Sequence, residues 1–168
     1  MSSYGIAQPT VNSADTKVLE ERQKLEQAAG NGAGWFYWIA GLSVINAVLA
    51  AVGSSTGFIF GLGVTSALGY VAQTMGATGK FVVLSISVGI AAAIAGCGAA
   101  ARKGKKWGFV VGMTVYGLDG LLFLAAGDWL GVIVHGVALL FILGGLSATS
   151  KLARMNTAVP GLSQVKTT

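Results

Sequence analysis

Three ionisable residues lie inside a stretch that is otherwise almost wholly apolar, YGLDGLLFLAAGDWLGVIVHG at residues 116–136. They are Asp119, Asp128 and His135. In a membrane, a carboxylate and an imidazole can hydrogen-bond to each other or carry protons along a polar path. Asp119 and His135 each lie eight residues from Gly127, on opposite sides of it. If Gly127 is the turn of a helical hairpin, both lie about 12 Å from it. The spacing predicts a buried Asp119–His135 pair.

Asp128 differs from the other two because it stands between Gly127 and Trp129, where the turn is expected. A carboxylate at this position accepts hydrogen bonds from the first backbone N–H groups of the next helix, and the helix dipole favours it there. We therefore predict that Asp128 is a helix cap at the membrane surface and that it takes no part in chemistry.

The composition is that of an integral membrane protein. Of the 168 residues, 54% are hydrophobic and 10% are charged, whereas soluble domains are about one quarter charged. Five apolar stretches each approach the roughly 20 residues that a helix needs to cross a bilayer. They are residues 35–53, 58–75, 81–101, 107–127 and 129–147. The predicted fold is an all-α membrane bundle over residues 35–147. A polar tail, flexible or a short helix, precedes it at 1–34, and a basic tail follows at 148–168.

The second stretch, residues 58–75, is the weakest candidate for a span. It is rich in glycine and also holds Thr65, Ser66, Gln73 and Thr74, which lower its apolar content. We predict four transmembrane helices plus this additional apolar helix, either re-entrant or interfacial. The alternative is a fifth span.

Basic residues cluster between the apolar stretches and after the last one. The first cluster is Arg102, Lys103, Lys105 and Lys106, and the C-terminal segment holds Lys151, Arg154 and Lys166. The positive-inside rule places such clusters, and with them the C-terminus, in the cytoplasm. No aromatic residues interleave with these charges, so a nucleic-acid surface is not expected.

The stretch at 81–101 carries small residues at every fourth position. This predicted packing ridge consists of Ser85, Gly89, Ala93, Cys97 and Ala101. Small residues at this spacing allow close helix approach in membranes, so we expect this helix to be central in the bundle. Gly108 and Gly112 begin a shorter version on the next helix, which predicts an antiparallel pair.

Motifs for enzymatic chemistry are not found in the sequence. There is one histidine and one cysteine, so neither a zinc motif nor an intrachain disulfide is expected. GLG at 61–63 lacks the further glycine and the setting of a dinucleotide site. We predict no enzyme activity, no metal and no cofactor.

Residues 35–147 resemble a known group of proteins. The resemblance lies in two segments, ARKGKKWGFVVGMTVYGLDGLLFLAAGDWLGVIVHGVALLFILGGL and WFYWIAGLSVINAVLA. With their Tyr-x-x-Asp-Gly and Asp-Trp-Leu patterns, they resemble a group of small bacterial multi-pass membrane proteins to which no activity is assigned. The resemblance implies the bacterial cytoplasmic membrane and a helical bundle, and it carries over no catalytic residue.

The expected role is that of a structural or accessory membrane subunit. It would contact the lipid bilayer and pack through its glycine and alanine ridges against another membrane protein or a second copy. The alternative is a small oligomeric transporter or channel that uses Asp119 and His135 in a polar path. The sequence has one such pair and no matching repeat in its other half, whereas secondary transporters are usually built from repeats.

Overall fold

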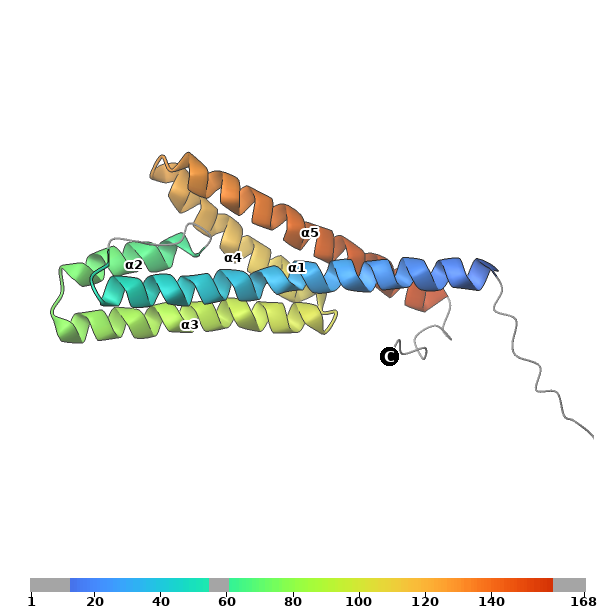
Figure 1. Cartoon of the computed structure of the whole chain (residues 1–168), viewed down its shortest axis with the longest axis horizontal. Coiled ribbons are helices and arrows are strands. Elements are labelled where there is room, and N and C mark those ends of the chain that lie inside the picture. Colours follow the sequence, from blue (N-terminus) through green and yellow to red (C-terminus); the bar gives the residue numbers. More distant parts are fainter. Residues whose placement is uncertain (1–12, 55–60, 159–168) are drawn as a thin grey trace, which may run out of the picture.

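The computed structural model describes residues 13–54 and 61–158, which form five helices and no strand (Figure 1). The helices are α1 (Ser13–Ala51), α2 (Gly63–Gln73), α3 (Ala77–Arg102), α4 (Lys106–Ala125) and α5 (Trp129–Ala158). Four of them, α1, α3, α4 and α5, are long and apolar enough to cross a membrane. The predicted all-α fold with four such helices is therefore confirmed.

Both terminal helices extend beyond the predicted limits of the bundle. α1 is one helix of 39 residues that continues without a break across residue 34, the expected boundary between the N-terminal tail and the bundle. α5 likewise runs to Ala158 through part of the predicted C-terminal tail. A short isolated helix must form a costly nucleus, whereas a segment joined to an existing helix only extends it. Residues 1–12 and 159–168 of the two tails lie outside the described residues.

α1 has its largest contacts with α3 and α5. It packs against α2, α3 and α5, while α4 packs against α2, α3 and α5. The core between them is formed by large buried side chains, among them Phe36, Ile39, Phe109, Tyr116 and Ile142. α3, which we expected to be central, packs against α1, α2 and α4 and lies along α1 in Figure 1.

Glycines mark the places where helix backbones come closest. A Cβ atom on Gly32 of α1 would lie 2.6 Å from the Cα of Gly145 on α5. A Cβ atom on Gly108 of α4 would lie 2.6 Å from the carbonyl oxygen of Cys97 on α3. The second contact places α3 and α4 together as an adjacent pair, as the spacing of Gly108 and Gly112 predicted.

The predicted small-residue ridge of α3 is not one packing surface. Cys97 and Ala101 are buried, but Ser85, Gly89 and Ala93 are exposed. Residues four apart are separated by about 40° around a helix, so a ridge of five such residues turns through about 160°. The buried side of α3 instead follows Val83, Ser87, Ala91, Ile94 and Gly98.

Charge is distributed unequally between the two ends of the bundle. The start of α1, the α3–α4 turn and the end of α5 lie toward the same end in Figure 1, which we call the basic end. Every described lysine and arginine except Lys80 belongs to these three segments. The opposite end holds the end of α1, the α2–α3 connection and the α4–α5 turn.

α2 covers only part of the apolar stretch at 58–75, of which residues 58–60 lie outside the described residues. Its 11 residues extend about 16 Å, roughly half of the 30 Å hydrocarbon layer, so α2 alone is too short to cross it. In Figure 1, α2 runs from the middle of the bundle back toward the opposite end, beside the end of α1.

Candidate functional site

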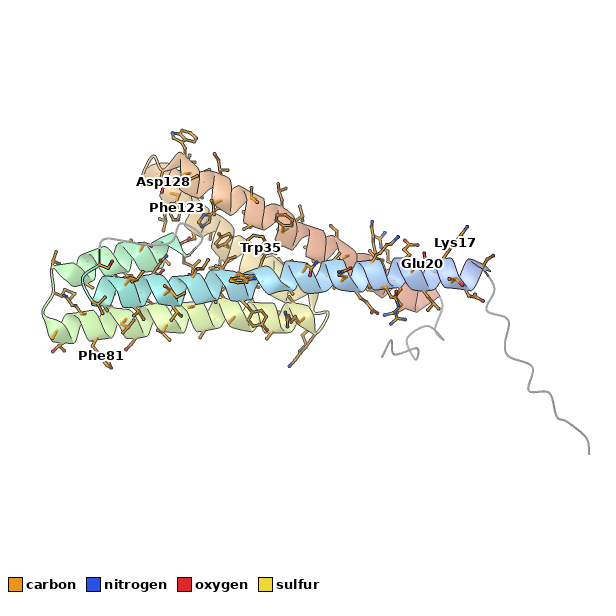
Figure 2. All side chains as sticks on the ribbon, in the orientation of Figure 1. Lys17, Glu20, Trp35, Phe81, Phe123 and Asp128 are labelled. Atoms are coloured by element: carbon orange, nitrogen blue, oxygen red, sulfur yellow. The ribbon has the colours of Figure 1, made fainter. Side chains whose placement is uncertain are left out.

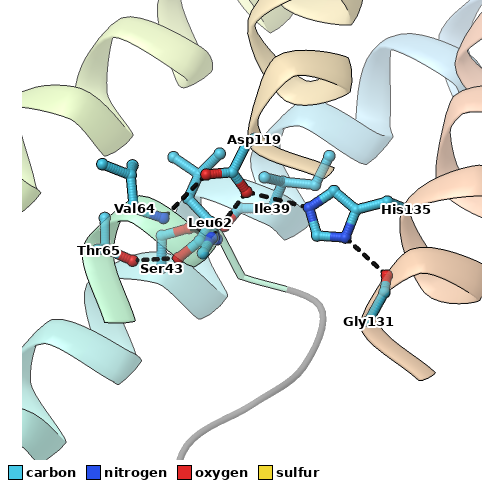
Figure 3. Close-up of polar contacts among 9 residues, drawn as sticks. Ile39, Ser43, Leu62, Val64, Thr65, Asp119, Gly131 and His135 are labelled. Carbon is cyan, nitrogen blue, oxygen red and sulfur yellow. Dashed lines mark hydrogen bonds and ion pairs between the residues drawn. The ribbon is translucent and has the colours of Figure 1, made fainter. Parts of the chain in front are cut away.

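The structure brings the two predicted intramembrane residues into contact. Nε2 of His135, on α5, lies 3.0 Å from Oδ2 of Asp119, on α4 (Figure 3). Their exposed fractions are 2% and 5%. Between them the chain turns at Gly127, whose φ of 73° favours glycine. Equal spacing from this turn brings the two side chains to one level, as the sequence predicted.

Asp119 also holds the start of α2. The backbone N–H of Gly63 donates to Oδ2 at 2.7 Å, and that of Val64 donates to Oδ1 at 2.9 Å. The first N–H groups of a helix have no partner within the helix, and the positive end of its dipole favours a carboxylate. Asp119 is therefore the cap of a helix that lies more than fifty residues earlier in the chain.

The sequence analysis did not predict that Asp119 also binds the start of α2. The donors are backbone groups, so no side chain in α2 signals them, and only the glycine-rich stretch around 61–63 marks the place. Gly63 allows close approach, because a Cβ atom there would lie 2.5 Å from the ring of Phe123.

Hydroxyl groups satisfy the remaining backbone groups near the start of α2. The N–H of Leu62 donates to Oγ of Ser43 at 2.7 Å, and Ser43 in turn donates to the carbonyl oxygen of Ile39. The hydroxyl of Thr65 donates to the carbonyl oxygen of Leu62 at 2.7 Å. Ser43 is eight residues before the end of α1, which places it about 12 Å from that end, the depth expected for Asp119 and His135.

Asn46 is buried on α1 about one turn beyond Ser43. A Cβ atom on Gly61 would lie 2.6 Å from its Nδ2 atom. Asn46 therefore lies beside the segment that leads into α2, and the close approach of that segment requires glycine at position 61.

The ring of His135 is contacted by two aromatic rings and by a hydrogen-bond partner at each nitrogen. Tyr116 stacks on one side with ring centroids 4.2 Å apart, and Phe123 packs at 4.7 Å. Nδ1 lies 2.9 Å from the carbonyl oxygen of Gly131. Aromatic stacking and two hydrogen bonds leave the imidazole one orientation in this packing.

The hydrogen bonds determine how many protons the pair holds. A carbonyl oxygen only accepts, so Nδ1 of His135 carries hydrogen. Nε2 and Oδ2 of Asp119 then face each other at 3.0 Å, and one further proton must lie between them, because two lone pairs would repel. Whether it is bonded to nitrogen or to oxygen, the pair has no net charge. Such a pair without net charge is compatible with a low-dielectric surrounding.

A groove on the surface of the bundle reaches this site. Its volume is about 290 Å³, and Asp119 contributes to its lining. The other lining residues are apolar: Leu62, Val64, Ile90, Val115, Leu118 and Leu122. The groove runs between α2, α3 and α4, and Asp119 is the one ionisable residue in its lining.

Removing the hydroxyl of Tyr116 is expected to stabilise the protein. This hydroxyl is buried and has no hydrogen-bond partner among the described residues. A buried hydroxyl without a partner is destabilising, so Tyr116→Phe should raise the free energy of unfolding by about 1 kcal/mol. Tyr116→Leu, the control, removes the stacking on His135 and should lower it by about 2 kcal/mol. Thermal unfolding in mild detergent measures both, and a clear loss in Tyr116→Phe would contradict the assignment.

The other predicted residues lie apart from this site. Asp128 accepts a hydrogen bond from the N–H of Gly131 at 3.0 Å at the start of α5, which is the capping position (labelled in Figure 2 near Phe123). Arg102, Lys103, Lys105 and Lys106 are exposed at the basic end. Within the described residues, no three His, Cys, Asp or Glu side chains are grouped to hold a metal ion.

Fold and site together define a class of protein: an all-helical bundle with four helices suited to cross a membrane and a buried Asp–His pair between two of them. Comparisons of the chain with protein-family models, with curated proteins and with solved structures return no match.

Proposed function

We propose that the chain is a multi-pass protein of the cytoplasmic membrane in which α1, α3, α4 and α5 cross the bilayer. The four apolar helices and the concentration of charge at the basic end support this arrangement. By the positive-inside rule the basic end, with both the start of α1 and the end of α5, faces the cytoplasm. α2 is then a re-entrant helix that enters and leaves from the opposite side.

A re-entrant α2 explains why its start is held so closely. Non-helical backbone at membrane depth is tolerated where protein covers it and satisfies its hydrogen bonds. Asp119 and Ser43 accept three consecutive N–H groups at this point, those of Leu62, Gly63 and Val64. The proposed depth and the observed contacts therefore agree.

We further propose that the protein serves as a structural or accessory membrane subunit. The observation that carries this is the use of Asp119: both carboxylate oxygens are engaged by groups of the protein itself, and the pair holds α2 in place. The exposed residues Ser85, Gly89 and Ala93 are here called the α3 strip. Because their side chains are small, a helix of a partner protein can pack closely against them.

Native mass spectrometry of the tagged protein, purified from its membrane in mild detergent, tests the accessory role. We expect a stoichiometric membrane partner that is lost in Gly89→Leu, because the leucine side chain would fill the α3 strip. Gly136→Leu is the matched control, since Gly136 is also an open helical position but lies on α5. A chain that is isolated alone, or a partner that both variants retain, would contradict this role.

A second candidate function is that of a small transporter or channel that moves protons. The groove of about 290 Å³ favours it, because Asp119 of the hydrogen-bonded pair is part of the groove's lining. Proton flux into proteoliposomes that carry a pH-sensitive dye would test it. Flux that is lost in a folded Asp119→Asn variant supports this function, and wild-type vesicles that are as tight as empty ones exclude it.

A further inference from the structure

A second and larger groove runs along the outer side of α1, away from the Asp119–His135 pair. Its volume is about 640 Å³, and Trp35, Trp38, Leu42 and Phe141 provide most of its apolar wall. Trp35 and Phe141 stack with ring centroids 5.2 Å apart, which joins α1 to α5 at this wall. Figure 2 shows Trp35 partway along α1, between the charged residues at its start and its apolar end.

Arg102, the last residue of α3, lies where this groove meets more polar surroundings. It lines the large groove, and it also lines a neighbouring cavity of about 340 Å³ that includes Glu26 and Asn156. A third cavity, of about 280 Å³, is formed by Arg102 with Tyr37 and Trp38 among others. The guanidinium carbon is 5.1 Å from the centroid of the Tyr37 ring, so the side chain is held over an aromatic face.

The net charge is positive where the large groove meets the polar cavity. Glu26, the acidic residue of the polar cavity, forms an ion pair with Arg22 at 2.8 Å. Arg102 forms no ion pair within the described part of the chain, and Lys103, Lys105 and Lys106 follow it closely. An arginine fork matches the oxygens of a phosphate group in two-point hydrogen bonding.

The length of the groove matches one leaflet of a bilayer. The lining follows α1 from Gly30 to Leu42, a length of about 18 Å, which is close to the roughly 15 Å of half of the hydrocarbon layer. Its polar part is at the basic end, where aromatic side chains of the membrane interface also gather. The guanidinium of Arg102 lies beside Tyr37, and Arg102 lines the groove together with Gly34 and Trp38. An apolar groove of this length with an arginine in its wall is suited to a lipid chain whose charged headgroup contacts the arginine.

We propose that this groove binds one anionic phospholipid. The phosphodiester group contacts Arg102, the polar part of the headgroup enters the cavity beside Asn156, and one acyl chain follows α1 between Trp38 and Phe141. Basic pockets between membrane helices bind anionic lipid headgroups through such contacts. The proposal rests on the membrane location alone and applies to an accessory subunit and to a transporter equally.

Lipid titration of the full-length, delipidated protein in detergent, followed by native mass spectrometry, tests the proposal. The two probes are phosphatidylglycerol and phosphatidylethanolamine with identical acyl chains. We expect one tightly bound phosphatidylglycerol per chain and a preference of about fivefold over phosphatidylethanolamine, the contribution of one basic residue near a membrane surface. Arg102→Gln should remove this preference, while Lys103→Gln, which changes a neighbouring charge that lines none of the three cavities, should retain it.

A second variant tests the acyl-chain part of the groove. Gly34 lines the groove, and a Cβ atom there would meet nothing within 4 Å, so Gly34→Leu is expected to fold and to weaken binding of both lipids. Gly41→Leu is the control, because Gly41 is equally open but lies outside the groove. Equal binding of the two lipids by the wild type, equal losses in Arg102→Gln and Lys103→Gln, or displacement of the lipid by inorganic phosphate would each overturn the proposal.

Discussion

Asp119→Ala is expected to lower the free energy of unfolding by about 3 kcal/mol, from two half-buried backbone donors left without an acceptor at about 1–2 kcal/mol each. These donors are the N–H groups of Gly63 and Val64, and His135 loses its partner in the same change. Reversible unfolding in mixed detergent micelles, followed by circular dichroism, measures the difference.

Asp119→Asn separates the capping role from the charge. Asparagine retains one carbonyl oxygen but turns an amide N–H₂ toward a backbone donor, so we expect it to recover less than half of the loss. Asp128→Ala is the matched control, because it removes a single cap at the half-buried start of α5 and should cost about 1 kcal/mol. Equal losses in Asp119→Ala and Asp128→Ala would show that the start of α2 does not depend on Asp119.

Gly32→Ala is expected to destabilise the contact between α1 and α5 by about 3 kcal/mol, at the upper end of the range for an overpacked site. The added methyl group would lie 2.6 Å from the Cα and 2.9 Å from the backbone nitrogen of Gly145. Backbone atoms cannot move aside as a flexible side chain can, so the two helices must separate. Unfolding in mixed micelles is again the measurement.

Gly41→Ala serves as the control for this second change. Gly41 lies on the same helix and a Cβ atom there would meet nothing within 4 Å, so the higher helix propensity of alanine should leave stability unchanged or raise it by up to about 1 kcal/mol. The prediction would fail if the two variants unfolded at the same detergent composition. A double variant, Gly32→Ala with Gly145→Ala, should be no more stable than Gly32→Ala, because both methyl groups occupy the same gap.

The all-α architecture and the pairing level of Asp119 and His135 could be predicted because they depend on local properties. A run of about 20 apolar residues is enough to indicate a helix that can cross a bilayer. Four such helices are present, and equal spacing from Gly127 places the two polar residues opposite each other. Asp128 at the start of α5 follows from the same local logic, since a cap and its donor are three residues apart.

The extent of the terminal helices was predicted less well. Residues 1–34 were expected to form a polar tail, either flexible or a short helix, whereas residues 13–34 are the first part of α1, which is continuous from Ser13. The polar residues of this segment show no apolar face of their own, so a sequence pattern gives no reason to join them to the bundle. Attachment to a stable helix removes the cost of nucleation, and this cost cannot be read from the segment alone.

Thus the sequence by itself determined the membrane class of the protein, its four long helices and the position of its Asp–His pair along them. Only the tertiary structure decided what that pair holds, which side of α3 is buried and where α1 and α5 touch. Asp119 binds backbone N–H groups of α2 more than fifty residues away, and Gly32 meets Gly145 across the bundle. Every residue has the same backbone donors, so their partners leave no mark in the sequence, and small residues permit close contact on any side of a helix without specifying which side is used.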